Sequence, residues 1–323
     1  MHMPRRNELK GTPVQSDAVS KRYVIKAFVV TGAIVAALPF VVYAPFVMQL
    51  MCYAIFAGSV GLLLGYGGLL SFGHAAYFGV GSYICAYTVK VWQVPPVAGI
   101  LLGVLVAVFL GLVIGALAIR RQGIYFSMVT LAFAQMIYFF CVRAPFTGAE
   151  DGIQSVPRGA FLGLSLANDM VLYWVVAAIF MAAMFVVYRV VHSPFGEVLV
   201  AIREHEPRAT SLGFRTSRFK LAIFVISAGL AGLAGGTKAL VTQLASLTDV
   251  HWLMSGDAVL MTILGGRGSI FGPAIGAVVV MWTKVYLAWM GPWVTAIQGV
   301  IFIFCVLLFR NGIIGLLKRW VKI

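Results

Sequence analysis

The stretch VAGILLGVLVAVFLGLVIGALAI (Val97–Ile119) contains no charged residue, and Arg120 and Arg121 follow it directly. About 20 consecutive, predominantly apolar residues are enough for a helix to cross the hydrocarbon core of a bilayer. The stretch is therefore predicted to form one membrane-spanning helix. Small residues at four-residue spacing, which let helix backbones approach closely in lipid, occur here and elsewhere at Gly99, Gly103, Gly111, Gly115, Ala228, Gly232, Gly236, Gly272 and Gly276.

Similar segments recur along the whole chain of 323 residues, of which 61% are hydrophobic and only 11% charged. Soluble domains are typically about 25% charged. The predicted fold class is therefore all-α, a polytopic transmembrane helical bundle. Apolar runs between helix breakers predict ten crossings, some short or interrupted, near residues 24–43, 46–65, 70–89, 97–119, 123–142, 169–190, 220–242, 257–266, 272–290 and 293–315.

The N-terminus is polar and basic, and no apolar run begins before about Tyr23. A cleaved signal peptide places its apolar core nearer the start of the chain. Residues 1–22 are therefore expected to remain as a basic tail. A transmembrane domain over residues 23–319 would follow, with a polar loop at 193–219 inside it and a short tail at 320–323.

Lysine and arginine predict the orientation, because cytoplasmic loops are enriched in both. With the N-terminus inside, the predicted crossings leave only five of the 24 basic residues on the outer side: Lys90, Arg143, Arg158, Lys238 and Lys284. Both termini and the 193–219 loop are therefore expected to be cytoplasmic. The net charge of +14 reflects this asymmetry, and no motif of nucleic-acid recognition accompanies it.

Five crossings in each half would invert the second half relative to the first, a geometry that places a substrate path between the halves. Each half also contains an interrupted span, GYGGLLSFG (Gly65–Gly73) and LGGRGSIFGP (Leu264–Pro273). Broken helices are tolerated at membrane depth where they are buried in protein or line a watery cavity. The alternative is two ordinary tight turns. The glycines concerned are Gly65, Gly67, Gly68, Gly265, Gly266 and Gly268.

Several classes of function lack their characteristic residues. Only ten acidic residues occur, nearly all in predicted loops or termini, so the mid-membrane carboxylates typical of ion-coupled transporters are not evident. The sequence has no Gly-x-x-x-x-Gly-Lys-Ser/Thr loop for ATP, no Gly-x-Ser-x-Gly turn and no His-Glu-x-x-His. Its four cysteines stand singly, without metal or redox spacing. Neither catalysis nor a metal site is expected.

One charged block, AIREHEPRATSLGFRTSRFK (Ala201–Lys220), interrupts the apolar segments. Pro207 suits the first turn of a short helix and Gly213 its end. Acidic residues before this helix favour the positive end of its dipole. A short cytoplasmic helix with charges on both sides is suited to docking a partner, and an ordinary solvated loop is the alternative.

The charged block resembles the coupling loop of ABC importer permeases, in the form found in branched-chain amino acid permeases of the LivM type. Glu206, Ala209 and Gly213 resemble the degenerate EAA-type pattern of that loop. Further segments resemble the same family in the same order: GYGGLLSFGHAAYFGVGSY (Gly65–Tyr83), GIYFSMVTLAFAQ (Gly123–Gln135), TGAEDGI (Thr147–Ile153), FVISAGLAGLAGG (Phe224–Gly236) and ILGGRGSIFGPAIGA (Ile263–Ala277).

The resemblance implies the membrane subunit of a type II-like importer in the bacterial cytoplasmic membrane. Two ATPase subunits, which bind ATP and Mg, would dock on the loop, and no cofactor is expected in this chain. A second, related permease would pair with it, and a soluble binding protein would deliver the cargo. Branched-chain or other amino acids are the expected cargo, with urea, short amides and aromatic acids as alternatives. The residues indicated for the ATPase contact are Arg203, Glu204, Glu206, Arg208, Ala209 and Gly213.

Polar residues in apolar segments are the candidates for the translocation path: Ser71, His74, Thr130 and Gln135. For His74 the alternative is a hydrogen bond that packs helices together. The family often has glutamate, and arginine three residues later, where this chain has Gln135 and Tyr138, a difference that bears on the cargo. On the outer side, Glu150 and Asp151 are candidates for contact with the binding protein, and a plain surface turn is the alternative.

Three other functions compete with an importer subunit. A stand-alone channel or facilitator for urea or another small solute would need no docking loop and would conduct without companions. A secondary transporter is disfavoured by the missing mid-membrane carboxylates. A membrane-embedded enzyme would need a nucleophile or a metal set that the sequence does not show.

Overall fold

The computed structural model describes residues 28–161, 164–266 and 268–291, and beyond them 293, 294, 296, 297, 299, 300, 303 and 312. These residues belong to two units, one ending at Val42 and the other beginning at Tyr43. In the first unit, an apolar helix that ends in the 3-10 turn η1 (Leu38–Phe40) occupies Phe28–Phe40. The predicted terminal tails and most of the last predicted crossing lie outside the described residues.

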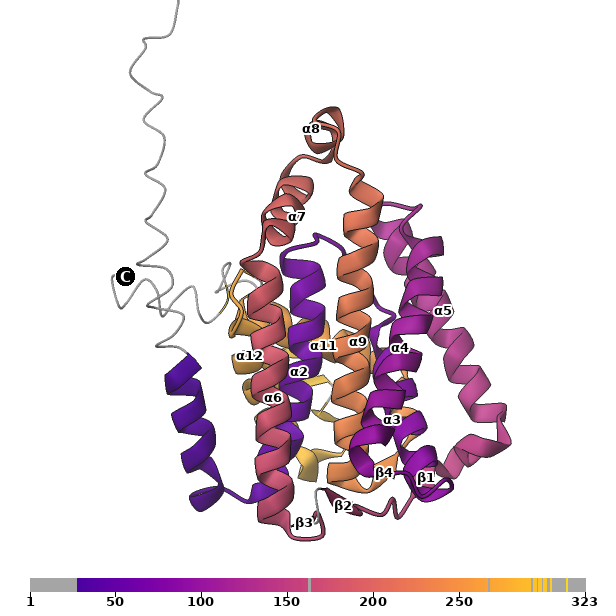
Figure 1. Ribbon diagram of the computed structural model, residues 1–323, viewed down its shortest axis with the longest axis vertical. Helices are drawn as coiled ribbons and strands as arrows, with labels where there is room; N and C mark the ends of the chain where they lie inside the picture. Colours follow the sequence, from indigo (N-terminus) through magenta and orange to yellow (C-terminus); the bar gives the residue numbers. More distant parts are fainter. Residues whose placement is uncertain are drawn as a thin grey trace, which may run out of the picture. The chain divides into compact units, whose positions relative to one another are not determined.

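The second unit is built mainly of helices (Figure 1). The helices are α2 (Ala44–Gly65), α3 (His74–Lys90), α4 (Pro96–Ala118), α5 (Ile124–Arg143), α6 (Asp169–Val191), α7 (Pro194–Glu204), α8 (Glu206–Ser211), α9 (Thr216–Thr242), α10 (Leu247–Val250), α11 (Trp252–Gly265) and α12 (Gly272–Tyr286). The 3-10 turns are η2 (Pro145–Thr147), η3 (Ala149–Asp151) and η4 (Ala288–Met290). Two antiparallel pairs of short strands join β1 (Ile153–Gln154) to β4 (Leu244–Ala245) and β2 (Ala160–Phe161) to β3 (Leu164–Ser165).

Among the described residues, five helices are long and apolar enough to cross a membrane: α2, α4, α5, α6 and α9. The helices α3, α11 and α12 are shorter, with 17, 14 and 15 residues. Each overlaps a segment that the apolar pattern marked as a crossing, although α11 begins at Trp252, five residues before the predicted start. The predicted multi-pass helical membrane fold is confirmed, whereas the inverted pairing of two halves stays a prediction.

Glycines bring the helices α3, α4 and α9 into backbone contact. A Cβ atom added to Gly81 would lie 2.3 Å from the carbonyl oxygen of Gly232, and one added to Gly103 would lie 2.8 Å from that of Gly81. At Gly235 the corresponding distance to the oxygen of Phe78 would be 1.8 Å. Close packing is therefore the role of Gly103 and Gly232, as their spacing predicts, and also of Gly81 and Gly235, which the predicted set did not include.

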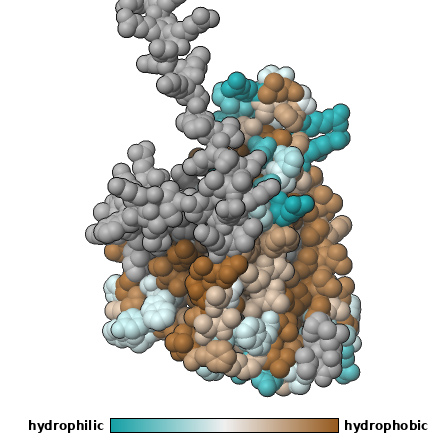
Figure 2. All heavy atoms as spheres, turned by 60° about the vertical axis from the view of Figure 1, so that its left-hand side comes forward, coloured by the Kyte–Doolittle hydropathy of each residue, from teal (hydrophilic) through white to brown (hydrophobic). Residues whose placement is uncertain are grey.

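On the face shown in Figure 2, apolar side chains cover much of the flank that is not grey, and hydrophilic ones gather around the end formed by α8. Leu105 and Phe109 of α4 and Phe139 of α5 are between 63% and 64% exposed. Apolar surfaces of this extent mark contact with a membrane or with another protein. The long helices therefore present their outer faces to a non-aqueous surrounding.

Candidate functional site

The charged block and the residues directly before it form α7 and α8, which project from the bundle between α6 and α9 (Figure 1). We call residues 193–215 the arm. Ser193 caps α7 by accepting a hydrogen bond from the Gly196 amide at 3.4 Å, and Pro194 lies in the first turn. The short helix α8 was predicted, but α7 was not. The sequence signal for α7 was the pair Ser193–Pro194, a cap residue followed by a proline suited to a first turn.

The arm helix α8 ends at a glycine in the left-handed region. Gly213 has a φ of 89°. Its N–H donates to the Thr210 oxygen at 2.9 Å, and the N–H of Phe214 donates to the Ala209 oxygen at 3.2 Å. These two bonds form the Schellman motif of helix ends, so the predicted end of the helix at Gly213 is confirmed. A Cβ atom at Gly213 would meet nothing within 4 Å, and a substitution there would strain the backbone without causing a clash.

Two of the charged residues predicted to touch an ATPase also contact the bundle, and their contact with an ATPase stays a prediction. The guanidinium of Arg203 donates to the carbonyl oxygen of Gly65, the last residue of α2. Glu206 accepts from the Lys220 ammonium with its Oε1 at 2.6 Å and from the Gln122 amide with its Oε2 at 3.4 Å. The arm is therefore tied to α2, to α9 and to the turn before α5.

Other residues of the arm face away from the bundle. Glu204 has a side chain that is 70% exposed, and Arg208 is exposed as well. Leu212 is 72% exposed at the end of α8, whereas Ala209 is buried. Leu212 thus places one apolar side chain among the exposed charged groups of the arm. Sequence reasoning missed Leu212, although its position next to Gly213 placed it at the helix end.

The first glycine break, residues 66–73, connects α2 to α3 and packs against the arm. Gly68 has a φ of 66°, and a Cβ atom there would lie 2.7 Å from Cγ of Arg203. At Gly67 it would lie 2.8 Å from the Leu63 oxygen. Burial raises the pKa of the Tyr66 hydroxyl, and the positive charge of Arg203 opposes this shift. The first break and the arm are therefore in contact, and the positive charge of Arg203 acts on a side chain of the break.

A buried chain of polar groups follows the first break. His74 begins α3 and is fully buried; its Nδ1 lies 3.1 Å from Ser71 Oγ and its Nε2 2.7 Å from Oγ of Ser227 in α9. Ser227 Oγ donates at 2.6 Å to the carbonyl oxygen of Ser59 in α2. Since that hydroxyl proton is used, Nε2 of His74 donates to Ser227 and Nδ1 accepts from Ser71. This arrangement ties α3 to α2 and α9, and it favours the packing role of His74.

The other two candidates for the path lie on α5. Thr130 is buried, and its hydroxyl donates to the Ser127 oxygen at 2.9 Å. A Cβ atom at Gly73 would lie 2.9 Å from the carbonyl oxygen of Thr130, so α5 touches the first break. Gln135 is half-buried. The structure thus brings Ser71, His74 and Thr130 to the same break, and translocation through them stays a prediction.

The second glycine break differs from the first in what surrounds it. Gly265 ends α11 and Gly266 has a φ of 111°. A Cβ atom at Gly265 would lie 1.7 Å from the oxygen of Gly272, and one at Gly276 equally close to the oxygen of Met261. At Gly268 it would meet nothing within 4 Å. This break is a turn between two helices that pack backbone against backbone.

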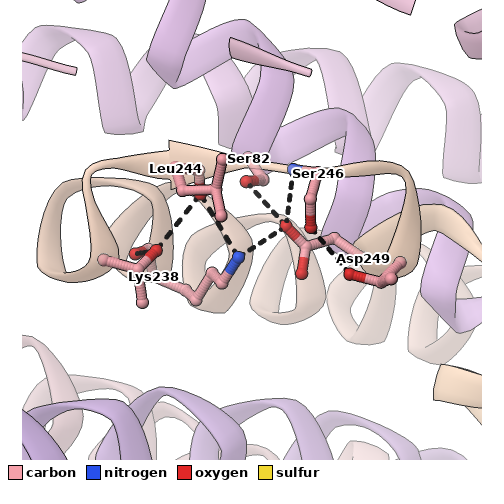
Figure 3. A network of polar contacts seen from close by, with 7 residues as sticks. Ser82, Lys238, Leu244, Ser246 and Asp249 are labelled. Atoms are coloured by element: carbon pink, nitrogen blue, oxygen red, sulfur yellow. Dashed lines mark hydrogen bonds and ion pairs between the residues drawn. The ribbon is translucent and has the colours of Figure 1, made fainter. Parts of the chain in front are cut away.

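A buried ion pair lies at the end of the unit opposite the arm (Figure 3). Lys238 donates to Asp249 Oδ2 at 2.7 Å and to the Leu244 oxygen at 3.2 Å. The same carboxylate oxygen accepts from the Ser246 amide at 3.2 Å and from the Ser82 hydroxyl at 3.4 Å. We call these five residues the Lys238 network. It joins α3, α9, β4 and α10.

Two ion pairs bear on the sequence interpretation of Lys238 and Asp257. Lys238 was assigned to the outer side, within the predicted crossing 220–242; it lies inside α9 and is 4% exposed. Asp257 was placed at the end of a span, but it lies within α11 and pairs with Lys284 of α12. Each lysine neutralises a carboxylate that no spacing pattern in the sequence connects to it.

The two acidic residues that are candidates for contact with the binding protein lie in a turn at the end opposite the arm. Glu150 and Asp151 are exposed in η3, the turn before β1. Gly148 and Gly152, with φ of 77° and 67°, flank them.

Among the described residues, no group of three or more His, Cys, Asp or Glu side chains is arranged to hold a metal ion.

Comparison with known proteins identifies the fold family. The family model described as "Branched-chain amino acid transport system / permease component" matches residues 42–306, most of the chain. The chain belongs to this permease family. The matched range contains the arm, both glycine breaks and the Lys238 network.

Three curated relatives are similar to this permease. The high-affinity branched-chain amino acid transport system permease proteins LivM of Salmonella typhimurium and Escherichia coli are 27% and 28% identical to it over 260 residues. These matches cover 72% of the chain and 60% of each relative, so the permease spans about 60% of their length. A probable LivM of Methanocaldococcus jannaschii is 26% identical over 276 residues, 73% of the chain and 78% of that relative. No solved structure matches.

Proposed function

We propose that this permease is the membrane subunit of an ATP-driven ABC importer for branched-chain or other amino acids. The observation that carries the proposal is the arm, a pair of polar helices projecting from an apolar bundle that has no ATP-binding loop of its own. Two separate ATPase subunits would bind ATP and Mg and dock on the arm. The named cargo of the three relatives, branched-chain amino acids, supports the choice of cargo.

The outward side of the arm has the composition of a docking surface. Leu212 supplies an exposed apolar anchor, and Glu204 and Arg208 supply charges of both signs beside it. Interfaces commonly combine an apolar centre with a polar rim. Ala209 and Gly213 would act indirectly, by packing α8 and by ending it.

The distribution of basic residues supports an orientation with the arm in the cytoplasm of a bacterium, across its cytoplasmic membrane. Arg120 and Arg121 follow α4, Arg189 lies in the last turn of α6, and the arm itself is rich in arginine. An excess of Lys and Arg marks the cytoplasmic side. Both termini would then also be cytoplasmic.

The remaining partners would be a second, related permease and a soluble binding protein. Glu150 and Asp151 lie exposed at the end opposite the arm, where they are available to steer a basic surface of the binding protein. Cargo would pass near the first break, lined in part by Thr130 and with Gln135 further along α5. A changed cargo preference in Gln135→Ala would support this path.

A transporter driven by coupled ions fits the structure less well. Asp249 and Asp257 are each paired with a lysine, Lys238 and Lys284. In each pair the lysine ammonium already neutralises the carboxylate, so no unpaired carboxylate is left at either position for a coupling cation. Energy for uphill transport would therefore come from the docked ATPases.

The proposal is tested by reconstituting the permease into liposomes with the ATPases, second permease and binding protein encoded by neighbouring genes. ATP-dependent accumulation of radiolabelled leucine is expected from the complete set and none from the permease alone. Glu204→Lys combined with Arg208→Glu should abolish accumulation and reduce co-purification of the ATPases.

Arg143→Glu is the matched control, since Arg143 is an exposed arginine at the opposite end of the unit. It should leave accumulation and co-purification unchanged. Uptake by the permease alone, independent of ATP, would instead show a channel and overturn the proposal.

A further inference from the structure

The arm is continuous in sequence with α6 and α9, and Arg203 also links it to α2 by a hydrogen bond. Its guanidinium reaches the carbonyl oxygen of Gly65, the last residue of α2. The last carbonyl groups of a helix have no partner inside the helix, and the negative end of the dipole attracts a cation. The arginine therefore occupies an acceptor that α2 itself cannot satisfy.

The stem of Arg203 makes a second contact with the same region. Its Cγ would lie 2.7 Å from a Cβ atom on Gly68, whose φ of 66° already favours glycine. Only a residue without a side chain allows the stem to lie this close to the backbone of the break. The end of α7 is thus fitted against both sides of the turn that follows α2.

The far end of this break is held rigidly. Ser71 and His74 belong to the buried chain that continues through Ser227 of α9 to the backbone of α2. The polar side-chain atoms of Ser71, His74 and Ser227 all have hydrogen-bond partners. A shift of residues 66–68 that moved these side chains would therefore break buried hydrogen bonds. A displacement of the arm would therefore reach the start of α3.

We propose that Arg203 is a positioning residue that transmits movement of the arm to the first break and the start of α3. The guanidinium–Gly65 contact and the packing of its stem on Gly68 carry this inference. It rests on the proposed importer function and assigns to Arg203 a task inside the permease. Its guanidinium also lies 3.9 Å from Oε1 of Glu204, so Arg203 links the outward docking surface to the first break.

The test uses the complete reconstituted importer with Arg203→Gln. Co-purification of the ATPases and their basal ATP hydrolysis should stay at the level of the unmodified complex. Leucine accumulated per ATP hydrolysed should fall about tenfold, within the range typical of coupling between sites. Arg203→Lys keeps the charge but loses the planar fork of donors. Its leucine accumulation per ATP should therefore lie between that of the unmodified complex and that of Arg203→Gln.

Two further variants make the result specific. Arg189→Gln removes an exposed arginine from the last turn of α6 at the same end of the unit, and it should keep uptake per ATP unchanged. Gly68→Ala disturbs the same contact from the other side and should reproduce the uncoupling of Arg203→Gln.

Three results would overturn the inference. Loss of ATPase co-purification in Arg203→Gln would show a direct ATPase contact. Uptake per ATP equal to that of Arg189→Gln would show no role in transmission. If Arg203→Gln does not fold, unchanged coupling in Arg203→Lys together with unchanged coupling in Gly68→Ala would have the same force. Failure of the unmodified complex to import would refute the importer function instead.

Discussion

At the arm end of α9, Lys220 pairs with Glu206, and their side chains are 11% and 28% exposed; near its other end Lys238 pairs with Asp249, and these are 6% and 2% exposed. About 27 Å of helix separates the two lysines, at 1.5 Å per residue. The first pair lies beside a surface that faces outward, whereas the second is enclosed by α3, β4 and α10. Lysine–carboxylate pairs thus occur near both ends of α9, and they differ mainly in how far the carboxylate is exposed.

The difference teaches which charges are available to a partner. Removing one member of a buried pair leaves an uncompensated charge, so such a pair tolerates little change. In the other pair Lys220 is also largely buried, but Glu206 is partly exposed and is solvated when the pair opens, so separating it costs less. The arm is therefore the end that can exchange its internal contacts for contacts with another protein, while the Lys238 network holds the opposite end together.

The largest effect is expected from breaking the buried pair. Asp249→Ala should lower the free energy of unfolding by about 3–5 kcal/mol, because Lys238 would remain buried without its partner. Thermal unfolding of the purified permease in detergent measures this. The double variant Lys238→Met with Asp249→Ala should recover most of the loss, and a double variant no more stable than the single one would contradict the interpretation.

A packing defect without charge gives an intermediate reference. Gly265→Ala would place a Cβ atom 1.7 Å from a backbone oxygen of α12, and overpacking of this kind typically costs about 1–3 kcal/mol. The matched control is Gly268→Ala in the same break, where a Cβ atom meets nothing within 4 Å. Unfolding curves of the two variants should differ clearly, and identical curves would refute the backbone contact between α11 and α12.

The smallest effect is expected at the arm. Glu206→Gln keeps the shape of the side chain but removes its charge opposite Lys220, and about 1 kcal/mol or less should be lost. The loss should shrink at high salt, because partly exposed charges are screened. The same salt titration should leave the effect of Asp249→Ala nearly constant. Equal salt dependence at both ends would remove the distinction between them.

Features of the fold that depend on local sequence were predictable. Long apolar runs located α2, α4, α6 and α9, because a helix in lipid needs a fixed length of apolar residues. Pro207 and Gly213 located α8 to within about one residue, since both act on the backbone beside them. The first break was located by the glycines from Gly65 to Gly73.

Features that depend on how segments fold back were not predictable. Lys238 and Asp249 are only 11 residues apart, yet they meet because β4 and α10 turn back over the end of α9. The resemblance to a family indicated Arg203 and Glu206 but not their direction, which is set by contacts with Gly65 and Lys220. Leu212 was missed because an isolated leucine carries no periodic pattern.

The glycine contacts between α3, α4 and α9 have a mechanical consequence. Backbone atoms have no rotamers, so surfaces that meet through Gly81, Gly103 and Gly232 cannot readjust by turning side chains. We therefore expect these three helices to move together as one rigid body. Sliding and tilting are left to neighbours such as α6, which packs through adaptable side chains, among them Leu172, Phe180 and Met184.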